Sequence, residues 1–532
     1  MSEQMNKPIP LRILIIGDFD GANVENSQHI KVSKSSFNDL FSQLTPRLYM
    51  RVSNKLTSEP KELNIDLKFN DIDSFRPESI SKQIDLINDA IKARKTLYEL
   101  SEKQISTDDA ADILKKSSVA NILIPELISA IDQADPQTLN NAIAKFDQSL
   151  SAQFDEILHN PKFQQLESSW RGLKLLLDNA DYHSIVQFEI LHTEKANLLE
   201  QFDEKIFPQE YDDTCEVPLS AIITDFDLSQ SDMNMLKKMA DKSAILQVAF
   251  IASIAPDFFG MRNIAHLVAI PDLASRLISP VHNEWKNFMQ SDSARWVSLM
   301  MNRFLLRDLY GQNQEKVADF NYTEKADASH PDSYLWGQPT WLMGIILARS
   351  YATVGSCLTI SGLGLGGEFG TLPTRQYPKS RTENILIPVE VSLTDEKIWS
   401  FIHVGITPLN TTENSNTVYI PLSANAYRSG GTTLHSTLAY HLYIGQIFHQ
   451  YYRIHQQIPS GSTPEQIADF VRDKIFTLIE PYGGDDPDKA VKVTVSPVEN
   501  TNNIYIVSIH VTPKLQIEAK DVEFTMQLQT QV

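Results

Sequence analysis

The chain has 532 residues, 42% of them hydrophobic, and a formal net charge of −20 at pH 7. This hydrophobic content is too high for a disordered protein, and the length predicts three or four compact domains. The acidic balance argues against nucleic acid as the main ligand and against docking on anionic lipid, because both need lysine and arginine. Two cysteines, Cys215 and Cys357, fit a reducing cytoplasm, and every apolar tract is shorter than the ~20 residues that span a bilayer. We therefore expect a cytoplasmic protein without membrane insertion.

The first seventy residues alternate between strand and helix patterns. Residues 11–16 form an apolar run that predicts a buried strand, and this strand ends at Gly17-Asp18-Phe19-Asp20-Gly21. Residues 34–44 have a helical pattern. Residues 63–69 alternate apolar and polar side chains with period two, which predicts a half-buried strand.

Helices are expected to follow. Ser74 is predicted to cap a helix that has Pro77 in its first turn and runs to about residue 103. The next stretch is polar, rich in alanine and broken at Pro125 and Pro136, which indicates a helical connector.

A larger second region begins near residue 153 and mixes strands with helices. Its strand-like runs are 185–191, 219–224, 245–251 and 386–392. Helix-like segments follow at 435–456 and 464–480. The mixture indicates an α/β protein.

The carboxyl-terminal residues have a strand pattern. Residues 491–495 and 504–511 resemble a hairpin. In the final run, one face carries the apolar side chains of Val522, Phe524, Met526 and Leu528. A terminal strand must pair with something, because bare N–H and C=O groups are costly. It either pairs with a strand of its own chain as an edge strand or is added to the sheet of a neighbouring subunit.

Residues 155–177 carry the most specific sequence signal. They predict a short helix, a break at Pro161 and a second helix with Trp170-Arg171-Gly172, and they resemble the opening signature of the large (TssC/VipB-like) sheath subunit of type VI secretion systems. Further matches are Ile254-Ala255-Pro256-Asp257-Phe258-Phe259-Gly260, Asp292-Ser293-Ala294-Arg295-Trp296, Asn302-Arg303-Phe304-Leu305-Leu306-Arg307, Tyr310-Gly311, Phe320-Asn321-Tyr322 and Tyr334-Leu335-Trp336-Gly337.

The amino-terminal block resembles the small (TssB/VipA-like) sheath subunit. The matching motifs are Ile15-Ile16-Gly17-Asp18-Phe19, Thr45-Pro46-Arg47-Leu48, Arg51-Val52-Ser53-Asn54-Lys55-Leu56, residues 63–69 and residues 71–80. The resemblance implies that the two subunits, usually separate polypeptides in the family, are fused in this chain. We expect a small-subunit-like domain at 1–103, the connector at 104–152 and a large-subunit-like region at 153–532, which ends in strands at 491–532.

The resemblance implies an α/β contractile-sheath fold, with mixed sheets flanked by helices and extended terminal strands that complete sheets between subunits. It implies a structural protomer, without enzymatic activity, cofactor or metal, that polymerises around an inner tube and contracts to propel it. The implied partners are further copies of the chain, an inner tube protein and a baseplate. A AAA+ disassembly ATPase stays open as a partner, although no segment matches the helix that this ATPase grips in the family.

Two other functions compete with this interpretation. Asp18-Phe19-Asp20-Gly21 resembles the start of metal-dependent phosphotransferases, in which the first aspartate attacks phosphorus and the second acts as a general acid. Gly483-Gly484-Asp485-Asp486 could supply a later metal-binding pair. However, Ala22 replaces the usual threonine, and Asp225-Phe226-Asp227 repeats the pattern elsewhere, so a strand-ending turn is favoured. The second competitor is a sheath-like baseplate adaptor.

Other motifs favour structural roles. Gly362-Leu363-Gly364-Leu365-Gly366-Gly367 has dinucleotide-binding spacing, but no helix pattern follows it, so a loop is expected. Arg303 and Arg307, four apart on a helix-like stretch, are expected to form ion pairs. Trp170, Trp296 and Trp336 are expected in the core. Solvated or core positions are expected for four histidines, His435, His441, His449 and His455.

Overall fold

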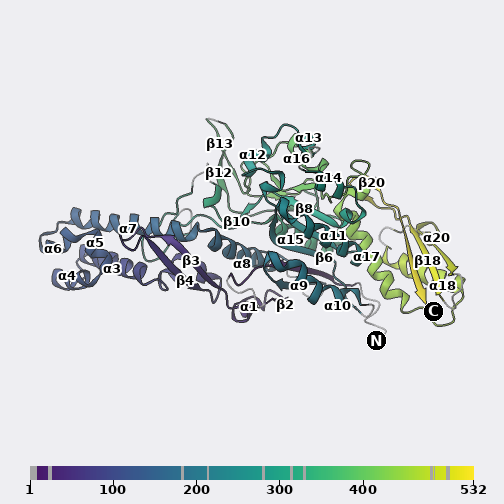
Figure 1. Ribbon diagram of the computed structural model, residues 1–532, viewed down its shortest axis with the longest axis horizontal. Helices are drawn as coiled ribbons and strands as arrows, with labels where there is room; N and C mark the ends of the chain where they lie inside the picture. Colours follow the sequence, from purple (N-terminus) through teal and green to yellow (C-terminus); the bar gives the residue numbers. More distant parts are fainter. Residues whose placement is uncertain are drawn as a thin grey trace.

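The computed structural model describes residues 9–21, 27–180, 182, 185–212, 215–277, 282–311, 315–326, 331–380, 382–479, 483, 486–498 and 504–531. The molecule is elongated, with an arm of helices at one end, the carboxyl-terminal strands at the other and an α/β body between them (Figure 1). Among the described residues, no helix combines the length and apolar character needed to cross a membrane.

The body is built on a seven-stranded mixed sheet in the order β14-β8-β7-β6-β1-β5-β2. Its strands are β1 (Leu11–Gly17), β2 (Gln28–Val32), β5 (Val186–His192), β6 (Ala221–Leu228), β7 (Ala249–Ile254), β8 (Val297–Met301) and β14 (Ile406–Pro408). Strand β2 is antiparallel to its neighbour, and the other neighbouring pairs are parallel. This architecture confirms the predicted α/β class.

Strand β1 lies in the interior of this sheet, between β5 and β6. It alternates between two hydrophobic cores: Ile13 and Ile15 belong to one, and Leu14 and Ile16 belong to the other. A strand buried on both faces needs a continuous apolar run, and this is why residues 11–16 carry one. The amino-terminal block and the later region therefore form a single folded body.

Helices cover both faces of the sheet (Figure 1). Helices α8 (Pro161–Asn179) and α15 (Pro339–Val354) belong to the same core as Ile13. Helices α9 (Leu198–Lys205), α11 (Met233–Leu246) and α16 (Asp395–His403) belong to the core of Leu14. The fold is a doubly wound sheet with a helical layer on each side.

The arm is a bundle of five helices that projects from the body. They are α3 (Asp85–Ser101), α4 (Thr107–Lys116), α5 (Ser118–Leu123), α6 (Pro125–Ser129) and α7 (Pro136–Leu158). Pro125 and Pro136 are the first residues of α6 and α7, where a missing N–H is tolerated. Helix α7 lies along α3, and an ion pair joins Arg94 to Asp147 at 2.9 Å. Helix α7 continues through residue 152 without interruption.

The predicted helix from Ser74 to residue 103 is wrong in its details. A 3-10 turn (Ile72–Phe75) is capped by the Asp71 side chain, and α2 (Pro77–Ser81) is separate from α3. The chain breaks at Gln83 because its amide group bonds both the N–H and the C=O of Lys68. Local periodicity cannot reveal this tertiary contact.

Three other predicted elements need correction. The stretch with Arg303 and Arg307 is not helical, because it contains β9 (Phe304–Leu305), which pairs with β10 (Trp336–Gly337). The run 245–251 begins inside α11 and becomes β7 only at Ala249. Of the run 386–392, only the first residues lie in a named strand, β13.

The carboxyl-terminal region packs a three-stranded antiparallel sheet against two helices. The helices are α17 (Leu438–His455) and α18 (Pro464–Leu478), and the strands are β17 (Val491–Pro497), β18 (Ile504–Val511) and β21 (Phe524–Gln531). The predicted hairpin is confirmed, because β17 pairs with β18 throughout its length. A small hairpin, β19 (Gln516–Ile517) and β20 (Lys520–Asp521), lies between β18 and β21 in the chain.

The remaining elements are short or peripheral. They are α1 (Phe37–Leu44), β3 (Arg47–Ser53), β4 (Glu62–Lys68), α10 (Phe207–Tyr211), α12 (Ile264–Val268), α13 (Leu273–Leu277), α14 (Asn283–Phe288), β11 (Glu368–Phe369), β12 (Arg375–Pro378), β13 (Asn384–Ile387), β15 (Asn410–Thr411), β16 (Val418–Tyr419) and α20 (Pro487–Ala490). Strands β3 and β4 form a hairpin, so the strand predicted at 63–69 is confirmed.

Candidate functional site

Trp170 joins helix α8 to the end of β1. The side chain is fully buried, and its indole Nε1 donates a hydrogen bond of 2.9 Å to the carbonyl oxygen of Phe19. Its ring stacks on Phe41 at a centroid distance of 3.8 Å and meets Phe19 and Phe37 edge-on. The predicted core role of Trp170 is confirmed, and the contact links the two sequence blocks.

Gly172 permits close packing of α8 on α15. A Cβ atom at this position would lie 2.3 Å from the indole Nε1 of Trp341. That Nε1 donates a hydrogen bond of 2.7 Å to Asp225 Oδ1, and the Ser169 hydroxyl donates to Oδ2. Burial of Asp225 outweighs both hydrogen bonds and raises its pKa to about 7.

Arg171 and Arg307 form a buried ion-pair network. Arg171 contacts Glu167 at 2.7 Å, while Arg307 contacts Glu167 at 3.2 Å and Glu324 at 2.7 Å. Burial alone would raise the pKa of Glu324, but Arg307 and the hydrogen bonds lower it to about 2. Arg303 pairs with Glu390 through two bonds of 2.9 Å. The predicted ion pairs of Arg303 and Arg307 are therefore confirmed, and the pair of Arg307 with Glu167 joins a loop to α8.

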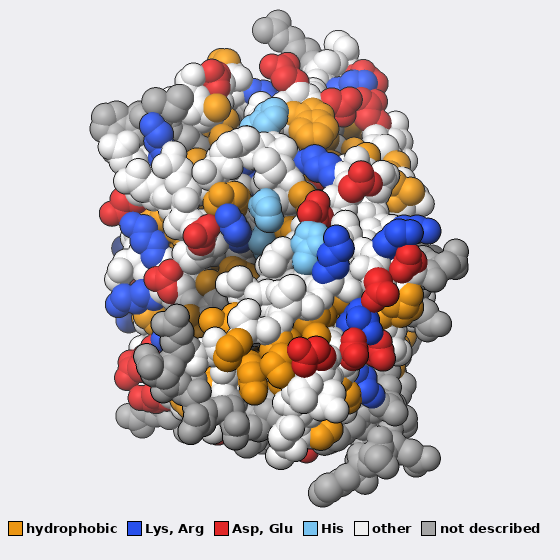
Figure 2. All heavy atoms as spheres, turned by 90° about the vertical axis from the view of Figure 1, so that its right-hand side faces the viewer, with side chains coloured by type: hydrophobic (Ala, Val, Ile, Leu, Met, Phe, Trp, Pro, Cys, Tyr) orange, Lys and Arg blue, Asp and Glu red, His pale blue; other side chains and the backbone are white. Residues whose placement is uncertain are grey.

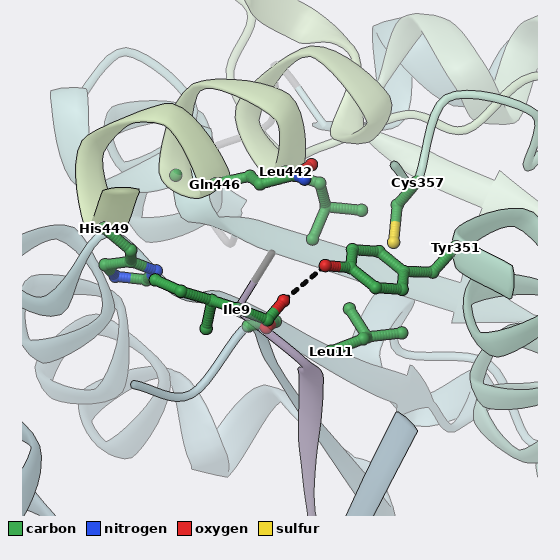
Figure 3. A pocket seen from close by; sticks show the side chains of 9 residues that line it. Ile9, Leu11, Tyr351, Cys357, Leu442, Gln446 and His449 are labelled. Atoms are coloured by element: carbon green, nitrogen blue, oxygen red, sulfur yellow. Dashed lines mark hydrogen bonds between the residues drawn. The ribbon is translucent and has the colours of Figure 1, made fainter. Parts of the chain in front are cut away.

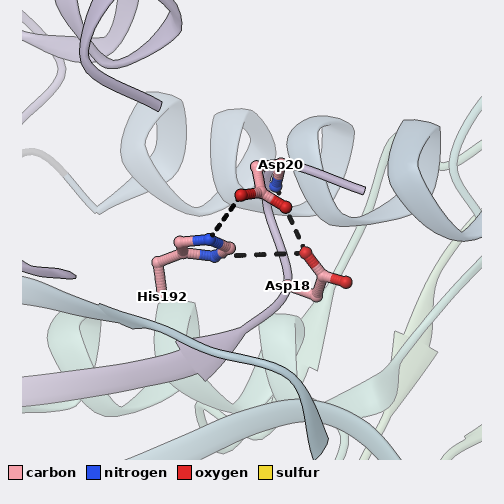
Figure 4. A group of neighbouring side chains, drawn as sticks. All are labelled: Asp18, Asp20 and His192. Atoms are coloured by element: carbon pink, nitrogen blue, oxygen red, sulfur yellow. Dashed lines mark hydrogen bonds and ion pairs between the residues drawn. The ribbon is translucent and has the colours of Figure 1, made fainter. Parts of the chain in front are cut away.

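Asp18, Asp20 and His192 form a compact group at the carboxyl ends of β1 and β5 (Figure 4). His192 Nε2 lies 3.1 Å from Asp20 Oδ2, and Asp18 Oδ1 accepts hydrogen bonds from the backbone amides of Asp20 and Gly21. Burial is the largest effect on Asp18 and raises its pKa. The expected strand-ending turn, with aspartates bonded to nearby backbone, is present.

The hydrogen bonds of His192 oppose metal binding by this group. The Phe19 amide donates to His192 Nδ1 at 3.2 Å, so Nδ1 carries no proton. The proton of the neutral ring is then on Nε2, which faces Asp20. In this arrangement the Nδ1 lone pair accepts the Phe19 hydrogen bond and Nε2 carries the proton, so neither nitrogen offers a free lone pair and the ring does not fit a metal ligand. Of the proposed later pair, Gly484 and Asp485 lie outside the described residues, while Asp486 bonds Lys489 at 2.9 Å.

The glycine motif at 362–367 is a loop, as expected. Strand β11 follows it and no helix does, so no helix N-terminus is available for a pyrophosphate. Among the histidines, His449 is half-buried, and its Nε2 donates a hydrogen bond of 2.9 Å to the carbonyl oxygen of Leu246. It lines a small hollow between α17 and the start of β1, where the Tyr351 hydroxyl donates to the Ile9 carbonyl (Figure 3). The expected core placement is confirmed for His441, which is buried.

Strand β21 pairs with β18 over its full length, from Phe524 opposite Val511 to Gln531 opposite Ile504. The predicted alternation is confirmed: Val522, Phe524 and Met526 are buried, and Leu528 packs partly buried against the same core. The Tyr440 hydroxyl bonds the carbonyl of Glu523, and Tyr451 bonds Thr530. The strand thus pairs within its own chain.

The three-stranded carboxyl-terminal sheet nevertheless has two edge strands without a further neighbour among the described residues, β17 and β21. The β17 edge carries Lys492 and Pro497, which are residues that discourage further pairing. The eight residues of β21, Phe-Thr-Met-Gln-Leu-Gln-Thr-Gln, include neither a charged residue nor a proline. Figure 2 views the molecule from this end and shows a group of hydrophobic side chains among scattered charges of both signs. The β21 edge is therefore the candidate pairing site.

Comparison with known families identifies the chain. Residues 140–427 match VipB, described as "EvpB/VC_A0108, tail sheath N-terminal domain". The chain belongs to the VipB tail sheath family. Residues 1–123 match VipA, described as "Type VI secretion system, VipA, VC_A0107 or Hcp2". This sheath protein therefore combines both blocks in one polypeptide, as the sequence motifs predicted.

Two curated relatives support the same assignment. The sheath protein is 26% identical over 464 residues to the type VI secretion system sheath protein TssC1 of Pseudomonas aeruginosa, covering 81% of this chain and 93% of TssC1. It is 25% identical over 116 residues to TssB1 of the same organism, covering 22% of this chain and 67% of TssB1. The function supported by these matches is that of a structural protomer of a contractile type VI sheath.

Solved structures with partial likeness include two anti-feeding prophage assemblies. The baseplate of that particle matches with a TM-score of 0.37 at 10% identity, over 68% of this chain and 81% of the other. Its contracted helical sheath matches with a TM-score of 0.35 at 10% identity, over 68% and 78%.

Sequence reasoning missed the cluster of acids below α8 and α15. The first Asp-Phe-Asp pattern directly follows β1 and the second lies in the last half of β6, its parallel neighbour. A Cβ on Gly17 would lie 3.3 Å from the Cβ of Asp225. The available signal was that each pattern directly follows an apolar run, since parallel strands place their carboxyl ends at one edge of the sheet. The buried partners Glu167 and Glu324 of Arg307 gave no comparable signal.

Proposed function

We propose that copies of this sheath protomer assemble into a helical tube around an inner tube protein, and that contraction of the tube propels the inner one. Membership of a tail sheath family and the presence of both sheath blocks in family order support this assembly. Further partners in the proposal are a baseplate and, less directly supported by the sequence, a AAA+ disassembly ATPase. The proposed location is the cytoplasm.

The observation that carries the proposal is the unprotected edge of β21. Its outward N–H and C=O groups can accept one more strand, and no charge or proline in the eight residues opposes this. Each backbone hydrogen bond contributes only about 0.5–1.5 kcal/mol net. Many such contacts per tube, each between different copies, can hold an open helical polymer together.

The pairing of β21 with β18 of the same chain refines the role proposed for Val522, Phe524, Met526 and Leu528. These side chains hold the strand on its own core, so we propose that β21 receives a strand from another copy at its free edge. Donation of β21 itself would require separation from β18 along the whole paired length. During contraction, such strand contacts would persist while the α/β bodies move as rigid units.

Two matched double variants test the edge. Gln527→Lys with Gln529→Lys adds two charges beside the free edge of β21 without touching its buried face. Thr494→Lys with Ser496→Lys adds the same charges in the same cross-strand rows, at the opposite edge of the sheet. We expect the first pair to abolish tubes in negative-stain electron microscopy and sedimentation, and the second pair to leave them intact.

Equal behaviour of the two double variants would contradict the proposed role of β21. Wild-type protein that never forms tubes or rings by itself, yet joins a baseplate, would support the alternative of a sheath-like adaptor. The phosphotransferase alternative is not favoured, because the family matches are to sheath proteins and Asp18 Oδ1 already accepts hydrogen bonds from the backbone amides of Asp20 and Gly21.

A further inference from the structure

The small hairpin β19–β20 connects the carboxyl-terminal sheet to the body. It lies in the chain between β18 and β21, and its two turn residues, Glu518 and Ala519, have φ values of 51° and 61°. Such left-handed conformations are unfavourable for residues with a side chain. The hairpin therefore depends on the contacts that hold it in place.

Those contacts come from loops of the α/β body. The Ser361 hydroxyl donates to Glu518 Oε1 at 3.4 Å, and the backbone amide of Ser423 also bonds the carboxyl group. The Lys520 ammonium donates to the Thr432 carbonyl at 3.3 Å. Ile517 is buried in the main core. The hairpin thus fastens the carboxyl-terminal sheet against these loops.

The hydrogen bonding at this contact is incomplete. Three buried oxygens, Glu518 Oε2, Ser423 Oγ and Thr432 Oγ1, have no hydrogen-bond partner among the described residues. Buried polar atoms without partners weaken the docked state relative to an open one. A carboxylate in this position is worse than a carboxylic acid, because the charged form needs more hydrogen bonds.

Two cations face Glu518, namely Lys520 from its own hairpin and Arg428 from the loop packed against it. The Arg428 guanidinium donates to the backbone carbonyls of Ile402, Asn425 and Tyr427. It is therefore occupied by neutral acceptors. Burial dominates, and although Ser361 and the two cations oppose it, the pKa of Glu518 rises from 4.5 to about 7.

We propose that residues 515–522 form a proton-controlled strap, which holds the carboxyl-terminal sheet on the body while Glu518 carries a proton and loosens when Glu518 ionises. The docked pKa lies above the value of an exposed glutamate, so docking is strongest below pH 4.5 and weakens as the pH rises to about 7. The strap is a property of the single chain and does not depend on assembly.

Amide hydrogen exchange of the full chain, measured as a monomer, tests the strap. After correction for intrinsic exchange, the equilibrium constant for opening of residues 515–522 should increase about 30-fold between pH 5.5 and pH 8.5. Linkage predicts this change for a Glu518 pKa of 4.5 in the open state and about 7 in the docked state. In Glu518→Gln the opening should be independent of pH. The control Glu523→Gln changes an exposed neighbour and should keep the wild-type pH dependence.

A wild-type exchange rate that does not change with pH after correction would overturn the proposal. So would a Glu518→Gln variant that keeps the wild-type pH dependence, because Glu518 would then be merely structural. If Glu518→Gln fails to fold, Glu518→Met offers a neutral side chain of similar length for the same comparison. The pH dependence of exchange in the wild-type protein tests the proposal without either variant.

Discussion

Gly172→Ala is expected to destabilise the body, even though alanine is the better helix former. The new Cβ would lie 2.3 Å from Nε1 and 2.5 Å from Cε2 of Trp341, so the indole must move. Overpacking of this kind costs about 1–3 kcal/mol. Moving the indole also breaks its bond to Asp225, which is worth about 1 kcal/mol net. The higher helix propensity of alanine stabilises the variant by only about 1 kcal/mol.

The net loss is therefore about 1–3 kcal/mol in the free energy of unfolding, measured by urea titration with circular dichroism. Gly344→Ala is the matched control on the facing helix, because its Cβ would meet flexible side-chain ends of Ile223 and Leu176 at 3.1 Å. It should change stability by less than about 1 kcal/mol. Trp341→Phe should make Gly172→Ala less costly. A Gly172→Ala protein as stable as the wild type would refute the packing argument.

Two further predictions concern charged groups. Arg307→Ala leaves Glu324 buried without its arginine partner and leaves Glu167 with Arg171 alone, so it should cost about 3–5 kcal/mol in urea unfolding. Arg51→Ala in an exposed pair should cost less than about 1 kcal/mol, and similar losses in both variants would contradict the network's role. With magnesium present, the wild-type protein should release phosphate from p-nitrophenyl phosphate no faster than the Asp18→Asn variant does. A magnesium-dependent rate that this variant abolishes would support the phosphotransferase alternative.

The sequence predicted elements well where burial leaves a local pattern. The apolar run 11–16 is β1 because both of its faces are buried, and the alternation at the carboxyl terminus is β21 because one face is buried. Pro161 and Pro136 also mark helix starts through their own backbone chemistry. These signals depend only on neighbours in the sequence.

Predictions failed where a distant contact decided the structure. Gln83 interrupts the helix predicted from Ser74 because it bonds Lys68 on a neighbouring strand. Arg303 was placed on a helix, but pairing with Trp336 and Gly337 makes the following residues a strand. The joining of Asp18 and Asp225 at one sheet edge depends on strand order, which no local pattern contains.

The place of β1 explains why the two sheath blocks work as one chain. A strand that pairs with β5 on one side and β6 on the other cannot leave without opening the middle of the sheet and exposing both cores. As a separate polypeptide, the amino-terminal block would have to overcome the entropy of association before it gained those contacts. The helical arm removes that cost, since a tethered strand meets its site at a high effective concentration. It also fixes the ratio of the two blocks at one to one.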